Sequence, residues 1–310
     1  MLFGGGFDSL SCMKAIAVCL AAALPCLAQL ASGPALPHKV VQDWAQLPAG
    51  MNFGECSGVA VDKNDNVWVF HRGAAPIMQF DKKGNLLRKW GDGLIKSAHG
   101  IEVDNEGNIW AVDVEGHTLL KFNPAGRIQM VIGRGAGNDD SKDQFNRPTG
   151  LVFAPNGDFF AADGYVNSRV VKFNKGGEHL THFGSKGTGD GQFDLVHDVA
   201  LDGAGRLYVA DRTNERVQIF DQSGKFLGKW TGIGAPWGLH YAAKENAMYM
   251  ADGKNNRIIK LNLDGQVQGV LGSYGRTQGK LDFAHHLAVD SEGSIYVVEI
   301  KNWRVQKFAK

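Results

Sequence analysis

Apolar and polar residues alternate in short runs along most of the chain, and one pattern of runs returns six times. Each copy has a first run, a tight turn, a second run rich in aromatic residues, and then a third alternating run. Alternation with a period of two, bounded by Gly, Asn and Asp turns, predicts short β-strands. The copies begin at "CSGVAVD", "AHGIEVD", "PTGLVFA", "VHDVALD", "PWGLHYA" and "AHHLAVD", about 40–50 residues apart.

Most copies continue into a fourth run that ends near "KWG", "VIG", "HFG" or "VLG". Four-stranded units at this spacing are typical of propeller blades. We therefore predict an all-β fold, a six-bladed β-propeller forming one domain over residues 39–310. The sixth copy stops at "VQKFAK", one strand short, whereas "HKVVQDWAQL" alternates without a blade of its own. We predict that residues 39–45 supply the missing strand, close the ring and protect an open edge.

The N-terminus reads as a targeting segment rather than as part of the fold. "MKAIAVCLAAALPCLAQLASG" begins at Met13 with one lysine, an apolar run and small residues before a cleavage point after Ala28. This pattern predicts a signal peptide over residues 1–28, with Met13 as an alternative start, and a linker over residues 29–38. The apolar run is too short to span a bilayer, so we expect no transmembrane segment in the mature chain and a secreted or periplasmic location. The alternative is a lipoprotein acylated at Cys26, although "ALPC" lacks the usual small residue before the cysteine.

Composition narrows the function classes. The 310 residues carry a net charge of +1, which argues against a nucleic-acid partner or a basic membrane-binding face. Three of the four cysteines lie within or before the signal segment, which leaves Cys56 alone and no internal disulfide in the mature domain. We expect a monomer held together by its apolar core.

Three histidines occupy the same position in three copies of the repeat. If the first strand of each blade lines the central channel, equivalent positions form a ring: Ser57, His99, Thr149, His197, Trp237 and His285. The histidines fall in alternate blades, about 120° apart in a six-bladed ring, so their imidazoles should converge on one axial point. Three nitrogen ligands with a fourth position open predict a catalytic zinc site. The neighbouring His286 should point away, because strand residues alternate sides.

A second ring follows the second strand of each blade, and two of its members are arginines: Arg72, Val114, Gly164, Arg212, Gly253 and Ile300. Beside a metal, Arg72 and Arg212 can clamp a carboxylate; the alternative is a blade-edge salt bridge for each. Tyr165, in "DGYVNSR", lies one residue past this ring and can act as a general base near a metal and an arginine.

A repeated "N-x-R" element resembles the NHL class of propeller repeats. It occurs at Asn167–Arg169, Asn214–Arg216, Asn255–Arg257 and Asn302–Arg304. We assign it a structural role, combining turn chemistry with a polar bridge between blades.

The motifs together resemble peptidyl-α-hydroxyglycine α-amidating lyase over residues 50–310. They are "DKNDNVWVFHRG", "AHGIEVDNEGNIWAVDV", "DGYVNSRVVKF", "GQFDLVHDVAL", "VADRTNERVQ" and "FAHHLAVDSEG". The resemblance implies zinc on His99, His197 and His285, a catalytic tyrosine at Tyr165, and active-site arginines at Arg72 and Arg212. It also implies cleavage of a C-terminal α-hydroxyglycine into an amide and glyoxylate. The substrate would be a small α-hydroxyglycine compound or a peptide C-terminus.

The resemblance gives only weak support for a structural calcium ion. Animal members of the family place a calcium-binding aspartate after the third histidine, where this chain has His286. Two other function classes fit a six-bladed propeller. One is a non-catalytic NHL propeller that binds a protein or ligand on its loop face. The other is a lactonase or related hydrolase, whose axial metal is held by carboxylate and amide groups rather than by histidines.

Overall fold

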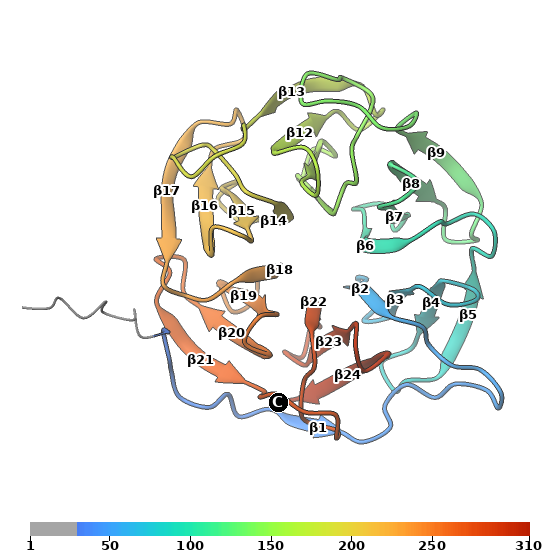
Figure 1. Ribbon diagram of the computed structural model, residues 1–310. Coiled ribbons are helices and arrows are strands. Elements are labelled where there is room, and N and C mark those ends of the chain that lie inside the picture. The colour runs from blue at the N-terminus through green and yellow to red at the C-terminus, as the bar shows by residue number, and fades with distance from the viewer. Residues whose placement is uncertain (1–29) are drawn as a thin grey trace, which may run out of the picture.

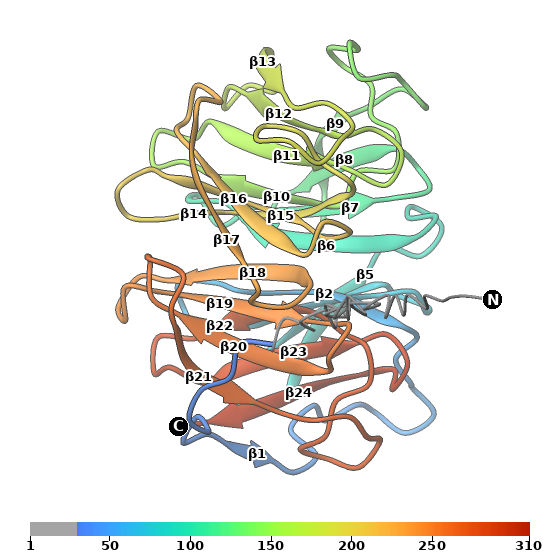
Figure 2. The same cartoon turned by 60° about the vertical axis from the view of Figure 1, so that its left-hand side comes forward.

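The computed structural model describes residues 30–310, which form 24 strands in six four-stranded antiparallel sheets. The sheets surround a central axis like blades, as Figure 1 shows end-on and Figure 2 shows after a 60° turn. This confirms the predicted all-β, six-bladed propeller. Within residues 30–310 there is no helix with the length and apolar character that a membrane crossing requires. The predicted signal peptide lies outside the described residues.

The blades follow one another along the chain, each running from an inner to an outer strand. Blade one has β2 (Cys56–Val61), β3 (Val67–His71), β4 (Ile77–Phe80) and β5 (Leu86–Trp90), and blade two has β6 (Ala98–Val103), β7 (Ile109–Asp113), β8 (Thr118–Phe122) and β9 (Ile128–Ile132). Blade three has β10 (Gly150–Phe153), β11 (Phe159–Asp163), β12 (Arg169–Phe173) and β13 (His179–Phe183), and blade four has β14 (Val196–Leu201), β15 (Leu207–Asp211), β16 (Arg216–Phe220) and β17 (Phe226–Thr231). Blade five has β18 (Pro236–Ala242), β19 (Ala247–Asp252), β20 (Arg257–Leu261) and β21 (Val267–Leu271), and blade six has β22 (Ala284–Val289), β23 (Ile295–Glu299), β24 (Arg304–Ala309) and β1 (Lys39–Val41).

Blade six combines the first described strand with the last three strands of the chain. β1 pairs antiparallel with β24, from Lys39 opposite Ala309 to Val41 opposite Lys307, and Figure 1 shows the two strands side by side. This confirms the predicted ring closure. The described part of the expected linker does more than connect, because Val270 of β21 exchanges backbone hydrogen bonds with Pro34 and Leu36, both at 2.9 Å. The N-terminal segment therefore fastens blade five as well as blade six.

The aspartate at the end of the first run explains why an aromatic residue recurs in the second. Asp202 accepts hydrogen bonds from the backbone N–H groups of Ala204 and Arg206, both at 2.9 Å, which fixes the turn. Its other oxygen accepts a hydrogen bond from the Tyr208 hydroxyl at 3.0 Å. Burial, followed by the nearby Asp202 carboxylate, raises the pKa of Tyr208, so the hydroxyl remains a donor. The same bond joins Asp62 to Trp68, Asp104 to Trp110 and Asp290 to Tyr296.

The apolar core is divided among the interfaces between adjacent blades. At one of them Phe160 and Val170 of blade three pack with Val209 and Phe220 of blade four, and all four side chains are buried. Cys56, the one cysteine within residues 30–310, is free and buried. Because each blade contributes to two such interfaces, a change at the central axis leaves most of the core in place.

The "N-x-R" element bridges blades as predicted. In blade three Arg169 is fully buried, and its Nε donates to Asp163 Oδ2 at 2.9 Å. Its remaining N–H groups donate to the backbone carbonyls of Asp139, Ser141 and Gln144, in the loop that arrives from blade two. The equivalent arginines also pair with an acid, Arg216 with Asp211, Arg257 with Asp252 and Arg304 with Glu299.

Replacing Arg169 with methionine should destabilise the propeller by about 3 kcal/mol. The substitution leaves the Asp163 carboxylate buried without its cation and three loop carbonyls without donors. The midpoint of urea unfolding, followed by circular dichroism, measures the loss. Arg134→Met is the matched control, since the Arg134 side chain is 83% exposed and its ion pair with Asp143 spans 3.8 Å. An equal effect of both substitutions would contradict the structural role of Arg169.

Candidate metal centre and active site

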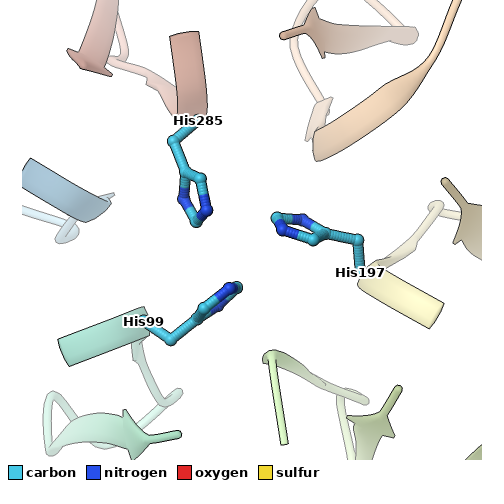
Figure 3. A group of neighbouring side chains, drawn as sticks. All are labelled: His99, His197 and His285. Carbon is cyan, nitrogen blue, oxygen red and sulfur yellow. The ribbon is translucent and has the colours of Figure 1, made fainter. Parts of the chain in front are cut away.

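Three imidazoles converge on the axis of the propeller. His99, His197 and His285 come from β6, β14 and β22, the inner strands of blades two, four and six. Their ring centroids are 4.8, 4.7 and 4.8 Å apart, and one ring nitrogen from each lies within 4.8 Å of the other two. Figure 3 shows the three rings pointing at a common space. The structure thus brings together the histidines that the sequence placed in one ring, as three ligands that can hold a metal ion.

The blades between the histidines fix how each imidazole is oriented. The Nδ1 atom of His99 lies 2.6 Å from the Thr149 carbonyl, that of His197 lies 2.5 Å from the Trp237 carbonyl, and that of His285 lies 2.7 Å from the Ser57 carbonyl. A carbonyl only accepts, so each Nδ1 carries a proton and each Nε2 has a free lone pair. Metal-binding histidines are commonly held in this way by a partner on the second nitrogen.

The histidines are also held in their neutral form. Burial, followed by the neighbouring imidazoles, lowers the pKa of His99, His197 and His285 well below the usual range. A neutral imidazole is the form that binds a metal ion, and three of them at one point suit zinc without requiring a sulfur or carboxylate ligand.

Tyr165 lies directly beside the three imidazoles. It follows β11 in the loop of blade three, and its hydroxyl is 3.2 Å from His99 Nε2 and 3.4 Å from His197 Nε2. The hydroxyl therefore faces the same nitrogen atoms that a metal ion would use. A substrate bound at that metal would lie within reach of the phenolic oxygen, as general-base chemistry requires.

The sequence did not single out a further cation beside this tyrosine. The Arg147 guanidinium lies 5.3 Å from the Tyr165 ring centroid, and the Arg212 guanidinium lies 5.9 Å from it. Arg147 forms an ion pair with Glu115, and its carbonyl accepts a hydrogen bond from the Tyr165 N–H at 3.4 Å. The feature of the sequence that could have indicated Arg147 is its position in "NRPTG", two residues before the ring position Thr149.

The two predicted arginines differ in how firmly they are held. Arg72 donates from Nε to the carbonyl of Ala98 at 3.1 Å and from Nη1 to Glu55 at 2.7 Å, so it carries the kind of salt bridge considered for both. Arg212 forms no ion pair with any residue of the described chain, and its guanidinium stacks over Trp237 at 4.2 Å from the ring centroid. Of these two arginines, Arg212 is therefore the one whose guanidinium has no ion-pair partner among residues 30–310.

The prediction that His286 points away from the axis is wrong. Its ring centroid lies 4.7 Å from that of His285 and 5.5 Å from that of His99. The pairing of β22 with β23 shifts register between Ala284 and Leu287, and such a bulge breaks the alternation of side chains. His286 Nδ1 lies 2.6 Å from the Ser57 carbonyl, and Nε2 lies 3.6 Å from Asp198 Oδ2.

The side chain of His286 itself offers no oxygen ligand to a structural calcium ion. Calcium takes oxygen ligands, whereas this position offers an imidazole that already faces the Ser57 carbonyl and the Asp198 carboxylate. One acid that the sequence reasoning did not select, Asp198, lies beside His286, and a second, Glu102, lies near Asp198. Asp198 is buried beside His197, and burial together with the Asp198 charge raises the pKa of Glu102 to about 8.

Comparisons with known proteins agree with the fold and the family. The family model described as "NHL repeat" matches residues 145–173 and 193–220, in blades three and four. Human NHL repeat-containing protein 3 is 32% identical over 277 residues, covering 81% of this chain and 78% of that protein. A Caenorhabditis elegans protein named as a probable peptidyl-alpha-hydroxyglycine alpha-amidating lyase is 25% identical over 291 residues, covering 81% of each chain. The chain belongs to the NHL-repeat propeller family that includes these amidating lyases.

This membership bears out the resemblance seen in the sequence. Among solved structures, a streptogramin B lyase matches with a TM-score of 0.65 and 13% identity, covering 87% of this chain and 96% of that one. At that identity the match shows the propeller fold alone. Lyase-named relatives within the NHL-repeat propellers support a lyase-type role for this chain.

Proposed function

We propose that this protein is an exported, zinc-dependent lyase that cleaves a C-terminal α-hydroxyglycine into an amide and glyoxylate. The observation that carries the proposal is one tyrosine hydroxyl facing two of three convergent, neutral imidazoles. Those imidazoles would hold the zinc ion. When bound, zinc would supply Lewis acidity toward the substrate hydroxyl.

The side chains of this chain account for the remaining steps. Deprotonated Tyr165 takes the proton from the substrate hydroxyl, the oxygen forms the aldehyde C=O bond, and the C–N bond breaks. The amide nitrogen leaves with the bonding electron pair and receives the proton back from the Tyr165 hydroxyl, so that an amide and glyoxylate are formed and the base is restored. Arg212 binds the carboxylate through paired N–H groups. Burial of the three imidazoles limits the access of bulk water to the reacting centre.

Export and oligomeric state are part of the same proposal. The segment from Met13 to Ala28 has the composition of a signal peptide, and the near-neutral chain gives no reason to expect a nucleic-acid partner. We expect a monomer in the periplasm or outside the cell, acting on a small α-hydroxyglycine compound or on a peptide C-terminus. Amino-terminal sequencing of the protein recovered from cell fractions tests the export and the cleavage after Ala28.

Metal analysis combined with glyoxylate release tests the central claim. The purified protein, prepared with zinc and without chelator, should contain about one zinc ion per chain and release glyoxylate from α-hydroxyhippurate. The second candidate is a non-catalytic propeller, favoured by the 32% identity to NHL repeat-containing protein 3. A metal-loaded protein that releases no glyoxylate from several α-hydroxyglycine substrates would establish that alternative instead.

Substitution of Arg212 by alanine should lower kcat/KM for α-hydroxyhippurate by about 10- to 100-fold. This range corresponds to the loss of a charge-assisted contact with the carboxylate. Steady-state kinetics on the zinc-loaded variant measure it. Lys229→Ala is the control, because Lys229 lies in the same blade with its charge paired to Asp190 at the surface. Unchanged kinetics for Arg212→Ala would show that Arg212 does not bind the substrate.

Arg72→Ala should also lower the rate, with an added loss of stability because Arg72 bonds to both Glu55 and the Ala98 carbonyl.

A further inference from the structure

A lysine recurs at one repeat position, in the third strand of the blade and opposite an aromatic residue of the second strand. In blade two Lys121 lies opposite Trp110, and its ammonium is 5.4 Å from the ring centroid of Trp110 and 3.3 Å from Asp104 Oδ2. The ammonium thus combines a cation–π contact with an ion pair to an acid at the β6–β7 turn. Three further lysines repeat the contact at 5.3, 5.6 and 5.2 Å from the ring centroid, and each also pairs with an acid of its own blade: Lys172 over Phe160, Lys260 over Tyr249 and Lys307 over Tyr296.

Blade four reaches the same arrangement with an arginine. Its third strand has Ile219 opposite Tyr208, so no lysine is present at this position. Arg206, from the preceding turn, takes over the role, because its guanidinium lies 5.8 Å from the Tyr208 ring centroid and 2.6 Å from Asp202 Oδ2. Blades two to six therefore each hold a cation beside an aromatic ring and an acid.

Blade one has the aromatic ring and the acid but not the cation. Gln79 lies opposite Trp68, at the position of the lysines, and the Trp68 indole donates to Asp62 Oδ2 at 3.1 Å. In the described part of the chain, no lysine or arginine forms an ion pair with Asp62 or a cation–π contact with Trp68. Arg88, opposite Gln79 on β5, is exposed and donates instead to the Pro124 carbonyl of blade two.

A groove between blades one and two opens at this position. Its volume is about 620 Å³, and its lining includes Asp62, Trp68, Gln79 and Arg88. We call it the blade-one groove. Gln79 is only 7% exposed, and its Oε1 atom is buried without a hydrogen-bond partner within residues 30–310. Rotation about the last side-chain torsion exchanges the amide oxygen and nitrogen, so the carbonyl can turn toward the groove. A glutamine side chain is also shorter than a lysine, so the place that the lysine ammonium takes in blade two is left to the groove.

We propose that the blade-one groove binds a small molecule through a primary alkylammonium group, which takes the place of the missing lysine. The ammonium lies over Trp68, the ring type that attracts cations most strongly, and donates to the Asp62 carboxylate and the Gln79 carbonyl. Because neighbouring strands are antiparallel, the β2–β3 turn that carries Asp62 lies at the opposite end of the blade from the loops that follow the second strands, where Tyr165 is found. The inference is therefore independent of the lyase function proposed above.

Butylammonium is the probe, because it reproduces the end of a lysine side chain. Nuclear magnetic resonance of the isotope-labelled protein follows the indole N–H of Trp68, assigned through Trp68→Phe. Butylammonium chloride should shift this resonance to saturation, with a dissociation constant on the order of 1 mM. Butanol, and sodium chloride at the same ionic strength, should leave it unshifted.

Two matched substitutions locate the site. Gln79→Lys should weaken butylammonium binding at least tenfold, because the new side chain supplies its own ammonium as Lys121 does in blade two. The midpoint of urea unfolding should be no lower than that of the parent. Gln129→Lys is the control, since Gln129 is exposed on β9 and outside the groove lining, and it should keep the parent dissociation constant. Asp62→Asn, which keeps an acceptor oxygen for the turn, should also weaken binding at least tenfold.

Three results would overturn the proposal. One is a Trp68 resonance that sodium chloride shifts as far as butylammonium does, since the site would then not recognise an amine. Another is unchanged binding in both Gln79→Lys and Asp62→Asn, which would place the amine elsewhere. The third is a response in Arg88→Gln but none in the parent, which would show that Arg88 fills the position in the natural chain.

Discussion

Replacing His197 with alanine is expected to give a folded protein that no longer retains zinc and no longer releases glyoxylate. The substitution removes one of three convergent nitrogen ligands, so the fall in metal affinity should exceed the roughly 10- to 100-fold typical of losing an outer-shell partner. Atomic emission analysis of zinc after extensive dialysis measures retention. Far-UV circular dichroism should show the parent strand content, because the apolar core is divided among the blade interfaces.

A second histidine variant controls for general effects of the substitution. His179 lies on β13, the outer strand of blade three, where it contacts His182 rather than the axis. His179→Ala should retain one zinc ion per chain and the parent rate. Zinc retention by His197→Ala at the parent level would show that the three imidazoles are not the metal ligands. A parent protein that stays metal-free when prepared with zinc would do the same.

The repeat allowed the convergence of the three histidines to be predicted from the sequence alone. Each blade is one copy of the same unit, so residues at the same place in the repeat occupy the same height and depth around the axis. Three histidines at one position in alternate copies therefore had to converge, and the centroid distances of 4.7 to 4.8 Å confirm this. The same logic placed Arg72 and Arg212 in one ring and Tyr165 just beyond it.

The orientation of His286 could not be predicted because it depends on a bulge. The register shifts directly after the ring position of β22, and Gly58, Gly100, Gly150 and Gly238 follow the ring position in four other blades. These glycines allow neighbouring inner strands to approach closely; a Cβ atom on Gly100 would lie 2.6 Å from the Thr149 carbonyl. These glycines at one repeat position were the feature of the sequence that could have indicated that side chains do not simply alternate along the inner strand at this point.

Contacts between loops could not be predicted from the sequence for a different reason. Arg147 and Glu55 lie in segments that precede the inner strands, and the repeat does not conserve their length or their path across the end of the propeller. Their pairing partners, Glu115 and Arg72, come from loops of other strands. Periodicity fixes the strands and the rings they build, whereas Arg147 beside Tyr165 and the Glu55 partner of Arg72 depend on loop conformations outside the repeat.

Substitution of Tyr165 by phenylalanine should abolish most glyoxylate release while zinc stays bound. The phenyl ring keeps the packing of the loop, and the change removes only the hydroxyl that lies 3.2 Å from His99 Nε2 and 3.4 Å from His197 Nε2. Loss of a general base typically lowers the rate by about 10²- to 10⁴-fold, and the loss should fall on kcat. Tyr241→Phe is the control, since the Tyr241 hydroxyl bonds to Asn246 in the β18–β19 turn, and this variant should keep the parent rate.

Three outcomes separate the possible roles of Tyr165. A variant with zinc but less than about a hundredth of the parent kcat identifies Tyr165 as the base, because only proton transfer has been removed. A variant that loses zinc together with activity would make the hydroxyl a contributor to metal binding. A variant that keeps more than about a tenth of the parent kcat would exclude the tyrosine as the base, and the proton would then have to pass to another group beside the imidazoles.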